Sequence, residues 1–252
     1  MTPIAILDHR YLDAAVSADL ADMEGWVSSA RDIARDGTRT PEQRQDSLRD
    51  LENHVHGGGE VALCLFQAAS KEIVTERFKS WSELISWAGY AAAPMGRLVL
   101  RLHDEGKEAS AAMEALYSAY CILSHVAKCG DDYRLHGRIY VPADWLRRAK
   151  ADVTNLSGSK SAPELREAID RMLDGVDRLL SAAHPASYLI RNRGLKRGVL
   201  TAQYVALAWL RKLRNQDPLA ADIAPSAWDR SLAAIRARLL LWFGRPQIPG
   251  GT

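Results

Sequence analysis

The sequence lacks several features that mark large classes of proteins. Its 252 residues include only three cysteines, Cys64, Cys121 and Cys129, an odd number without the spacing of metal ligands. We expect them to be reduced thiols, as in cytoplasmic proteins. No apolar run approaches the length of a membrane span, and Met1–Asp8 lacks the basic start and long apolar core of a signal peptide. The sequence therefore predicts a cytoplasmic protein without an integral membrane segment.

The chain also has little excess charge of one sign. A formal net charge of +2 is too small to argue for nucleic acid or a membrane surface as the main partner. Hydrophobic residues make up 47% and charged residues 25%, as in ordinary globular proteins. β-Branched residues are scarce beside Ala, Leu and Arg, which favours helix. We expect one all-α domain over residues 1–252, with residues 244–252 as a flexible tail.

Apolar residues recur at helical spacing from residue 11 to 36, and Gly37 is expected to end that helix in a left-handed conformation. Thr40 and Pro41 are the N-cap and first residue of the next helix. The segment 81–103 is apolar on several faces, which predicts a central helix, and Pro94 predicts a kink in it. Further helices are expected over residues 41–54, 60–79, 107–128, 142–150, 162–184, 188–214 and 226–243.

Two acids in the first helix are candidate metal ligands. Asp32 and Asp36 are four residues apart, so their carboxylates project from one helix face. Two inward carboxylates can share Mg²⁺, a cation that prefers oxygen ligands and often bridges to substrate phosphate. The alternative is a solvated face on which they pair with Arg31 or Arg35.

A second group of charges follows the helix over 107–128. Asp131 and Asp132 are followed by the basic residues Arg134 and Arg138. Carboxylates facing arginines suggest binding of metal ions and phosphate. The alternative is a solvated helix terminus with an ordinary loop.

Four motifs in this order resemble the squalene/phytoene synthase family across nearly the full chain. Asp32-Ile-Ala-Arg-Asp36 is similar to the family's first aspartate-rich motif, which binds Mg²⁺ and a prenyl diphosphate. The small residues, proline and Gly-Arg pair of Trp87–Leu100 resemble a family helix. Gly137–Pro142 matches the signature after the second aspartate-rich motif, and Tyr204 stands where the family has a tyrosine. The resemblance implies an all-α, single-domain bundle of the class I isoprenoid synthase type.

The second aspartate-rich motif departs from the family pattern. In an ungapped alignment, Ile122 and His125 replace the family's glutamine and asparagine, and Cys129 and Tyr133 replace its two aspartates. A shift of one residue recovers Asp132 as the second aspartate. In the family the two motifs together hold two prenyl diphosphates, so this chain is expected to bind one.

The resemblance implies a Mg²⁺-dependent prenyltransferase. Our leading hypothesis is transfer of a prenyl group from a C5–C15 prenyl diphosphate to a small aromatic, carbazole-like acceptor in natural-product biosynthesis. Asp32, Asp36 and Asp132 are the expected metal ligands, and His125 and Tyr133 are the residues expected to orient the acceptor or take its proton. The expected substrate-binding residues are Arg134, Arg138, Tyr140, Tyr204, Ile122 and Cys129.

Two other functions are compatible with the same residues. One is head-to-head synthesis of squalene or a carotenoid precursor, with Asp131 and Asp132 as replacement ligands. The other is a non-catalytic binding or assembly module that keeps the family's bundle.

Overall fold

The computed structural model describes residues 6–7, 25–26, 28–30, 32–54 and 59–243. Over these residues the regular structure is helical, apart from one isolated β-bridge between Arg77 and Ile139. Residues 25–26, 28–30 and 32–35 form what we call the N-terminal helical segment. The α-helices that follow are α2 (Pro41–His54), α3 (Gly59–Val74), α4 (Trp81–Ala91), α5 (Ala93–Leu102), α6 (Ser110–Ala127), α7 (Cys129–His136), α8 (Ala143–Ala149), α9 (Pro163–Ala183), α10 (Ala186–Leu189), α11 (Arg193–Asn215) and α12 (Ala227–Phe243). Two short 3₁₀ helices, η2 (Lys107–Ala109) and η3 (Val153–Ser157), lie in the connections.

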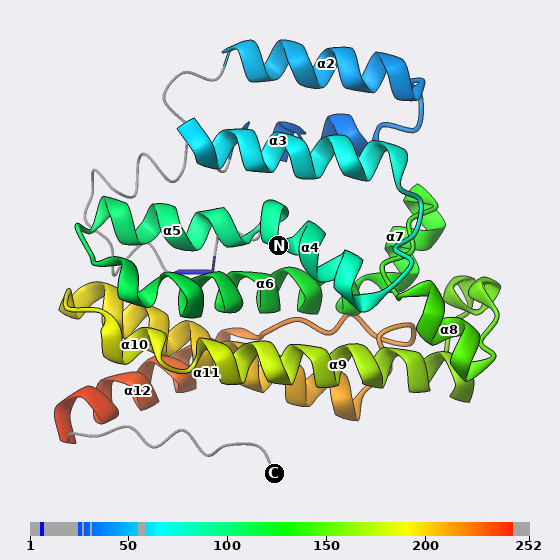
Figure 1. The fold of residues 1–252 in the computed structure, drawn as a ribbon. Helices are drawn as coiled ribbons and strands as arrows, with labels where there is room; N and C mark the ends of the chain where they lie inside the picture. The colour runs from blue at the N-terminus through cyan, green and yellow to red at the C-terminus, as the bar shows by residue number, and fades with distance from the viewer. Residues whose placement is uncertain (1–5, 8–24, 27, 31, 55–58, 244–252) are drawn as a thin grey trace.

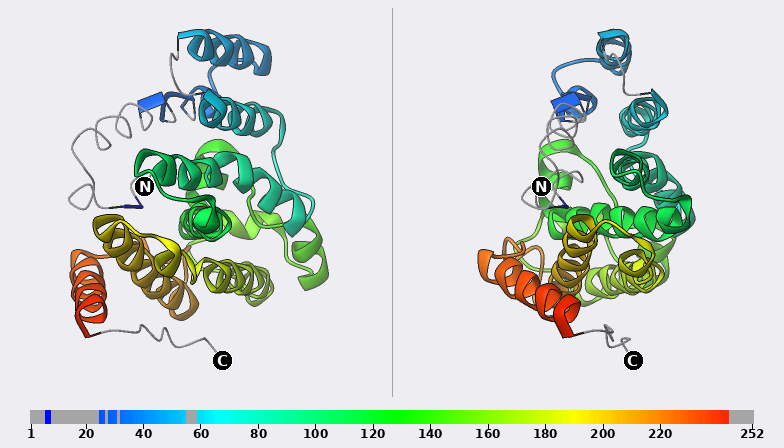
Figure 2. Two further views of the ribbon diagram at one scale, coloured as in Figure 1. Left: turned by 60° about the vertical axis from the view of Figure 1, so that its left-hand side comes forward. Right: turned by 90° about the vertical axis from the view of Figure 1, so that its left-hand side faces the viewer.

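Helix α6 lies at the centre of the bundle (Figure 1). It packs against α9 and α11 on one side and against α4 and α5 on the other. Beyond α4 and α5 the chain adds α3 and then α2, and α12 packs on α11 (Figure 2). Most residues of α6 from Ala112 to Ala127 are buried, as expected for a helix that is apolar all round. The sequence predicted the central position for residues 81–103, which instead cover one side of α6.

Two predicted helices are each divided in the structure. Residues 81–103 form α4 and α5, which meet at Ala92 with φ −140° and ψ −40°. Pro94 lies in the first turn of α5, where a backbone N–H would have no partner within the helix. The predicted kink is therefore a complete break between two helices. The predicted helix over 188–214 is interrupted at residues 190–192, and the Asn192 side chain caps α11 by accepting from the Leu195 N–H at 2.9 Å.

The predicted start of α2 is confirmed. The Thr40 hydroxyl accepts from the Gln43 N–H at 3.3 Å, and the Gln43 side chain accepts from the Thr40 N–H at 2.9 Å. The left-handed conformation predicted for Gly37 is wrong; of the described glycines, Gly137 alone has positive φ. Residues 11–24 of the first predicted helix and the predicted tail at 244–252 lie outside the described residues.

A small apolar cluster holds the N-terminal helical segment on α2 and α3. Ala30 and Ala34 pack with Leu48 of α2 and with three residues of α3, namely Phe66, Ala69 and Ile73. Small alanines let the segment approach α3 closely, which brings the polar residues beside them to the edge of α3. In the described part of the chain, no helix is long and apolar enough to cross a membrane.

The close approach of α5 to α6 at Gly96 gives a test of this packing. A Cβ atom at Gly96 would lie 2.9 Å from the backbone carbon of Met113, which cannot move without shifting α6. We expect Gly96→Ala to lower the free energy of unfolding by about 1–3 kcal/mol in urea titrations. Gly89→Ala is the matched control, because a Cβ there meets nothing within 4 Å, and it should raise stability by about 0.5–1 kcal/mol. Equal effects of the two substitutions would contradict the packing described here.

Candidate active site

The end of α7 directs the following segment into the interior. Gly137 has φ +62°, a left-handed conformation that favours glycine, and its N–H donates to the Tyr133 carbonyl at 2.9 Å. The next N–H, of Arg138, donates to the Asp132 carbonyl at 3.0 Å. Ile139 then donates its N–H to the Glu76 carbonyl at 3.0 Å. This pairing beside the end of α3 places the Tyr140 side chain in the interior, next to α3.

A cluster of polar side chains is buried where these segments meet. Arg35 donates from Nε to Glu72 Oε1 at 2.9 Å and from Nη2 to the Tyr140 hydroxyl at 2.9 Å, and its Nη1 lies 3.5 Å from Asp132 Oδ1. The Tyr140 hydroxyl in turn donates to Glu72. We refer to Arg35, Glu72, His125, Asp132 and Tyr140 as the buried cluster.

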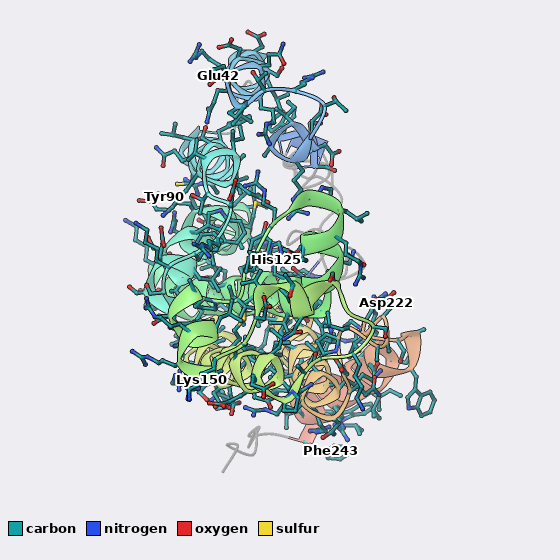
Figure 3. All side chains as sticks on the ribbon, turned by 90° about the vertical axis from the view of Figure 1, so that its right-hand side faces the viewer. Glu42, Tyr90, His125, Lys150, Asp222 and Phe243 are labelled. Carbon is teal, nitrogen blue, oxygen red and sulfur yellow. The ribbon has the colours of Figure 1, made fainter. Side chains whose placement is uncertain are left out.

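His125 lies in the interior of the bundle (Figure 3), where it connects the buried cluster to the aromatic core. Its Nδ1 lies 2.8 Å from Asp132 Oδ2, so Asp132 forms a hydrogen bond with His125 and an ion pair with Arg35. The imidazole stacks on the Tyr140 ring with centroids 3.7 Å apart and meets the edge of Trp87 at 5.4 Å. The imidazole is therefore held by Tyr140 on one face, by the contact with Trp87 and by Asp132 at one nitrogen.

The charges in the buried cluster compensate one another. Burial alone would raise the pKa of Glu72, but the Arg35 charge and the hydrogen bond from Tyr140 outweigh it and hold the pKa below its usual value. The pKa of Asp132 is likewise lowered, against burial, by His125 and Arg35. Burial lowers the pKa of His125 despite Asp132, so this imidazole is neutral at pH 7. Burial raises the pKa of Tyr140 further above 10, so the phenol keeps its proton.

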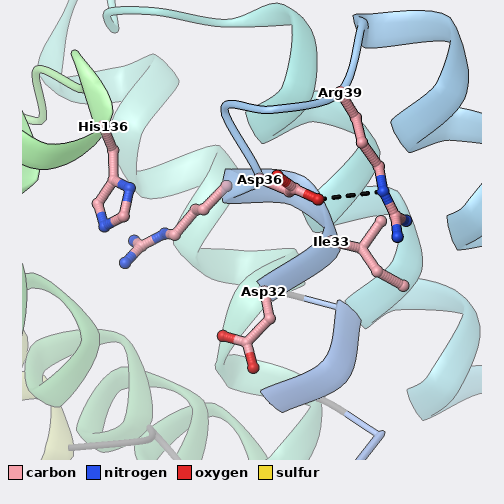
Figure 4. A pocket seen from close by; sticks show the side chains of 6 residues that line it. Asp32, Ile33, Asp36, Arg39 and His136 are labelled. Carbon is pink, nitrogen blue, oxygen red and sulfur yellow. Dashed lines mark ion pairs between the residues drawn. The ribbon is translucent and has the colours of Figure 1, made fainter.

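An open pocket of about 480 Å³ borders the buried cluster (Figure 4). Its lining residues are Asp32, Ile33, Arg35, Asp36, Arg39 and His136. The Asp32 carboxylate is exposed in this pocket. The Asp36 carboxylate turns instead toward Arg39, whose Nε lies 3.1 Å away, and accepts from the N–H and hydroxyl of Thr38 at 2.9 and 2.5 Å. The two acids thus share a pocket but point apart.

The structure separates the neighbouring acids at the start of α7. Asp132 is buried in the cluster, whereas Asp131 is exposed and pairs with Arg134 at 2.6 Å. Arg138 is buried beside the cluster and donates to the Thr75 carbonyl at 2.7 Å. Of the predicted substrate-binding arginines, Arg138 therefore lies at the buried cluster and Arg134 lies on the surface.

The remaining predicted residues lie in or against the apolar core. Ile122 is fully buried, and burial raises the pKa of the Cys129 thiol to about 12, so it stays protonated. Tyr133 is half-buried on α7 and packs against the same core. Tyr204 is half-buried on α11, and burial and Tyr188 raise its pKa. None of these four residues lines the open pocket.

The predicted magnesium ligands do not converge. Within the described residues, no three His, Cys, Asp or Glu side chains are arranged to hold a metal ion. Asp36 is engaged by Thr38 and Arg39, and Asp132 by His125 and Arg35. Asp32 keeps its carboxylate exposed in the open pocket. One carboxylate together with substrate phosphate oxygens is a common way to hold Mg²⁺, so Asp32 fits such a role while the buried cluster does not.

Glu72 was not among the predicted site residues. Arg35 was predicted only as a possible ion-pair partner of Asp32 and Asp36 on a solvated helix face. Glu72 is 5% exposed, although it lies on the last turns of a predicted amphipathic helix. The sequence contains a sign that Glu72 is buried, because the apolar residues Ala68, Ala69 and Ile73 lie beside it on the helix. A carboxylate on the apolar face of a helix indicates a buried partner.

The lowered pKa of Glu72 gives a pH-dependent prediction. Because its pKa lies below the ordinary 4.5, the unfolded chain binds more protons as the pH falls below about 4.5, and the contribution of the charged carboxylate to stability is lost. Glu72→Gln should cost roughly 1–3 kcal/mol at pH 7. In urea titrations between pH 7 and 3.5, this gap to the unmodified protein should narrow as the pH falls.

The control for that series is Glu167→Gln. It removes an exposed ion pair with Arg171, so the urea midpoint should hardly change at any pH. A gap for Glu72→Gln that stays constant from pH 7 to 3.5 would contradict a charged, stabilising carboxylate.

The chain is similar to a known protein family and to several of its members. The sequence profile of squalene/phytoene synthases matches residues 8–236. Hydroxysqualene synthases of Rhodopseudomonas palustris and Zymomonas mobilis are 33% and 30% identical over 158 and 165 residues, which are 63% and 66% of this chain. The matched region spans about half of each relative, 54% in both cases. A hydroxysqualene synthase of Sinorhizobium fredii is 25% identical over 77% of this chain and 73% of its own.

Two solved structures share the fold. The crystal structure of a dehydrosqualene synthase with a ligand superposes with a TM-score of 0.74 at 16% identity, over 96% of this chain and 91% of that one. Squalene synthase HpnC from Alicyclobacillus acidocaldarius gives a TM-score of 0.71 at 18% identity, over 82% and 86%. The predicted all-α fold of the isoprenoid synthase type is therefore confirmed. From the match over residues 8–236, the chain belongs to the squalene/phytoene synthase family.

Proposed function

We propose that the protein is a prenyltransferase that condenses prenyl diphosphates in a reaction of the squalene/phytoene type. The observation that carries this proposal is the open pocket of about 480 Å³, in which the exposed Asp32 carboxylate lies with Arg39 and His136. The names of the relatives, hydroxysqualene and phytoene synthases, support condensation over other prenyl transfers.

The residues of the pocket suit a diphosphate. The Arg39 guanidinium is exposed. Its Nε pairs with Asp36 and its Nη1 donates to the Ser47 hydroxyl at 2.9 Å, which leaves three of its five N–H donors for phosphate oxygens. His136 contributes a second nitrogen donor from the end of α7. In the proposed reaction the bond between the allylic carbon and the diphosphate oxygen breaks, and these groups stabilise the charge on the departing pyrophosphate. Arg35 does not take part, because the buried cluster occupies its donors.

Among the described residues of this site, Asp32 alone keeps a carboxylate that fits magnesium. Asp32 would hold the ion together with diphosphate oxygens, and the bound ion would supply further positive charge to the leaving group. Asp36 and Asp132 serve the structure instead: Asp36 fixes the turn after the N-terminal helical segment, and Asp132 orients His125.

Transfer to a small aromatic acceptor is the second candidate function. It is favoured by the neutral character of the positions that replace the second aspartate-rich motif. Ile122 and Cys129 are buried and uncharged, His125 is neutral at pH 7, and Asp132 is balanced by Arg35. A pocket with one exposed carboxylate suits one diphosphate and an uncharged second substrate. The relatives give this candidate less support than condensation.

Product analysis distinguishes the candidates. The protein is incubated with Mg²⁺ and C5, C10 or C15 allylic diphosphates, with and without a panel of aromatic acceptors, and products are followed by mass. Condensation predicts a C30 product from the C15 substrate alone. A prenylated aromatic product without any C30 compound would replace condensation by the second candidate. Absence of pyrophosphate release under every condition would contradict both and support a non-catalytic module.

The role of Asp32 has its own test. Asp32→Ala should lower turnover by about 10²-fold or more, because the pocket loses its exposed carboxylate. The urea midpoint should stay unchanged, since this side chain is exposed. Asp46→Ala is the control, because Asp46 is an exposed acid of α2 that pairs with Arg49 away from the pocket. Equal turnover of the two variants would remove Asp32 from the mechanism.

A further inference from the structure

Helix α12 exposes large apolar side chains at the surface of the bundle. It packs on α11, and the residues that it buries are the small Ala233 and Ala237. Leu232 and Leu240 are half-buried, whereas its other large apolar side chains are exposed. Those that are at least 40% exposed are Trp228, Ile235, Leu239, Leu241, Trp242 and Phe243, with Trp228, Trp242 and Phe243 above 70%. Leu241 lies on the other side of the helix, and we call the remaining five residues the α12 face.

The spacing within the α12 face shows that it is a continuous stripe. Trp228, Ile235, Leu239 and Trp242 follow one another at intervals of seven, four and three residues, which places them along one side of a helix. An ordinary surface helix buries such a stripe and exposes its small and polar residues. In α12 the apolar stripe is exposed and the small alanines are buried. Exposed apolar stripes of this kind mark interaction surfaces.

The charges around the stripe are of one sign. Arg230, Arg236 and Arg238 are exposed on α12, and within the described structure no carboxylate lies at ion-pair distance from any of them. The helix carries a single acid, Asp229, which is already paired with Lys212 at 2.5 Å and accepts from the Ser226 hydroxyl. The α12 face therefore combines apolar side chains with unpaired positive charge.

A neighbouring element extends this surface. Tyr188 and Leu189 of α10 are 44% and 43% exposed, and the exposed Arg191 and Arg193 follow them. Helices α10 and α12 lie at the same end of the bundle (Figure 1). Tyr188 and Arg236 also lie near one residue of α11, Tyr204, on whose hydroxyl both act electrostatically. The apolar and basic residues of the two helices thus adjoin.

We propose that the α12 face binds an anionic lipid surface, with α12 lying flat in the membrane interface. Tryptophan and phenylalanine partition to the depth of the headgroups, and arginines attract anionic lipids. A second copy of the chain fits less well, because a two-fold interface would bring the arginines of both copies together. Residues 227–243 are too short to span a bilayer, so the helix lies on the membrane and does not cross it.

Vesicle flotation with the full chain tests this proposal, and it needs no enzymatic activity. The protein should float with vesicles of equal parts phosphatidylcholine and phosphatidylglycerol, and more weakly with phosphatidylcholine alone. Trp228→Ser combined with Trp242→Ser should lower the partition coefficient by at least about tenfold. Arg236→Glu combined with Arg238→Glu should abolish the preference for phosphatidylglycerol, because it reverses the charge beside the stripe.

The matched control is Leu135→Ser. Leu135 is an apolar side chain of α7 that is 73% exposed, and its replacement should leave flotation unchanged. Circular dichroism confirms that each variant is folded. Failure of the unmodified protein to float would overturn the proposal, as would equal flotation of the double tryptophan variant. A dimer in sedimentation velocity that dissociates in the double tryptophan variant would also overturn it, because the α12 face would then be covered by a second copy.

Discussion

The ion pair between Arg35 and Glu72 is the interaction on which the candidate active site depends. It joins the N-terminal helical segment to α3, and the other nitrogens of Arg35 reach Tyr140 and Asp132. A guanidinium can do this because it presents five N–H donors in one plane. Without it, the buried carboxylates of Glu72 and Asp132 would lack their shared cation, which is costly in the interior. The open pocket borders this cluster, so its shape follows from the same contacts.

Most of the fold was predictable from hydrophobic spacing, and the errors have physical reasons. The helix boundaries near Pro41 and residues 162–184 agree with the structure because caps and prolines mark them locally. The breaks at Ala92 and at residues 190–192 were missed because the apolar pattern continues through them. The end of α3 at Val74 was missed because residues 75–79 pair with a segment more than sixty residues later, which no local pattern reveals.

The candidate site was predictable in part. The motif around Asp32 and the segment Gly137–Pro142 led to the right parts of the chain, since both border the pocket or the buried cluster. The partners of Asp132 were not predictable, because they are set by tertiary contacts. Asp36 is held by a local turn, whereas Asp132 is neutralised by Arg35 from a distant helix. Spacing can place carboxylates on one face of a helix, but it does not decide which of them stays free for a ligand.

A double-mutant cycle between Arg35 and Glu72 tests most directly whether their ion pair holds the site together. Arg35→Met leaves the buried carboxylates of Glu72 and Asp132 without their shared cation and should cost about 3–5 kcal/mol in urea unfolding. Glu72→Leu leaves Arg35 paired with Asp132 alone and should cost roughly 2–3 kcal/mol. In the double variant Asp132 still lacks its cation, but no unpaired Glu72 carboxylate remains. Its loss in free energy of unfolding should therefore be at least about 2 kcal/mol smaller than the sum of the losses of the two single variants. Costs that add to within about 0.5 kcal/mol would show that the two residues are not coupled and would contradict the account.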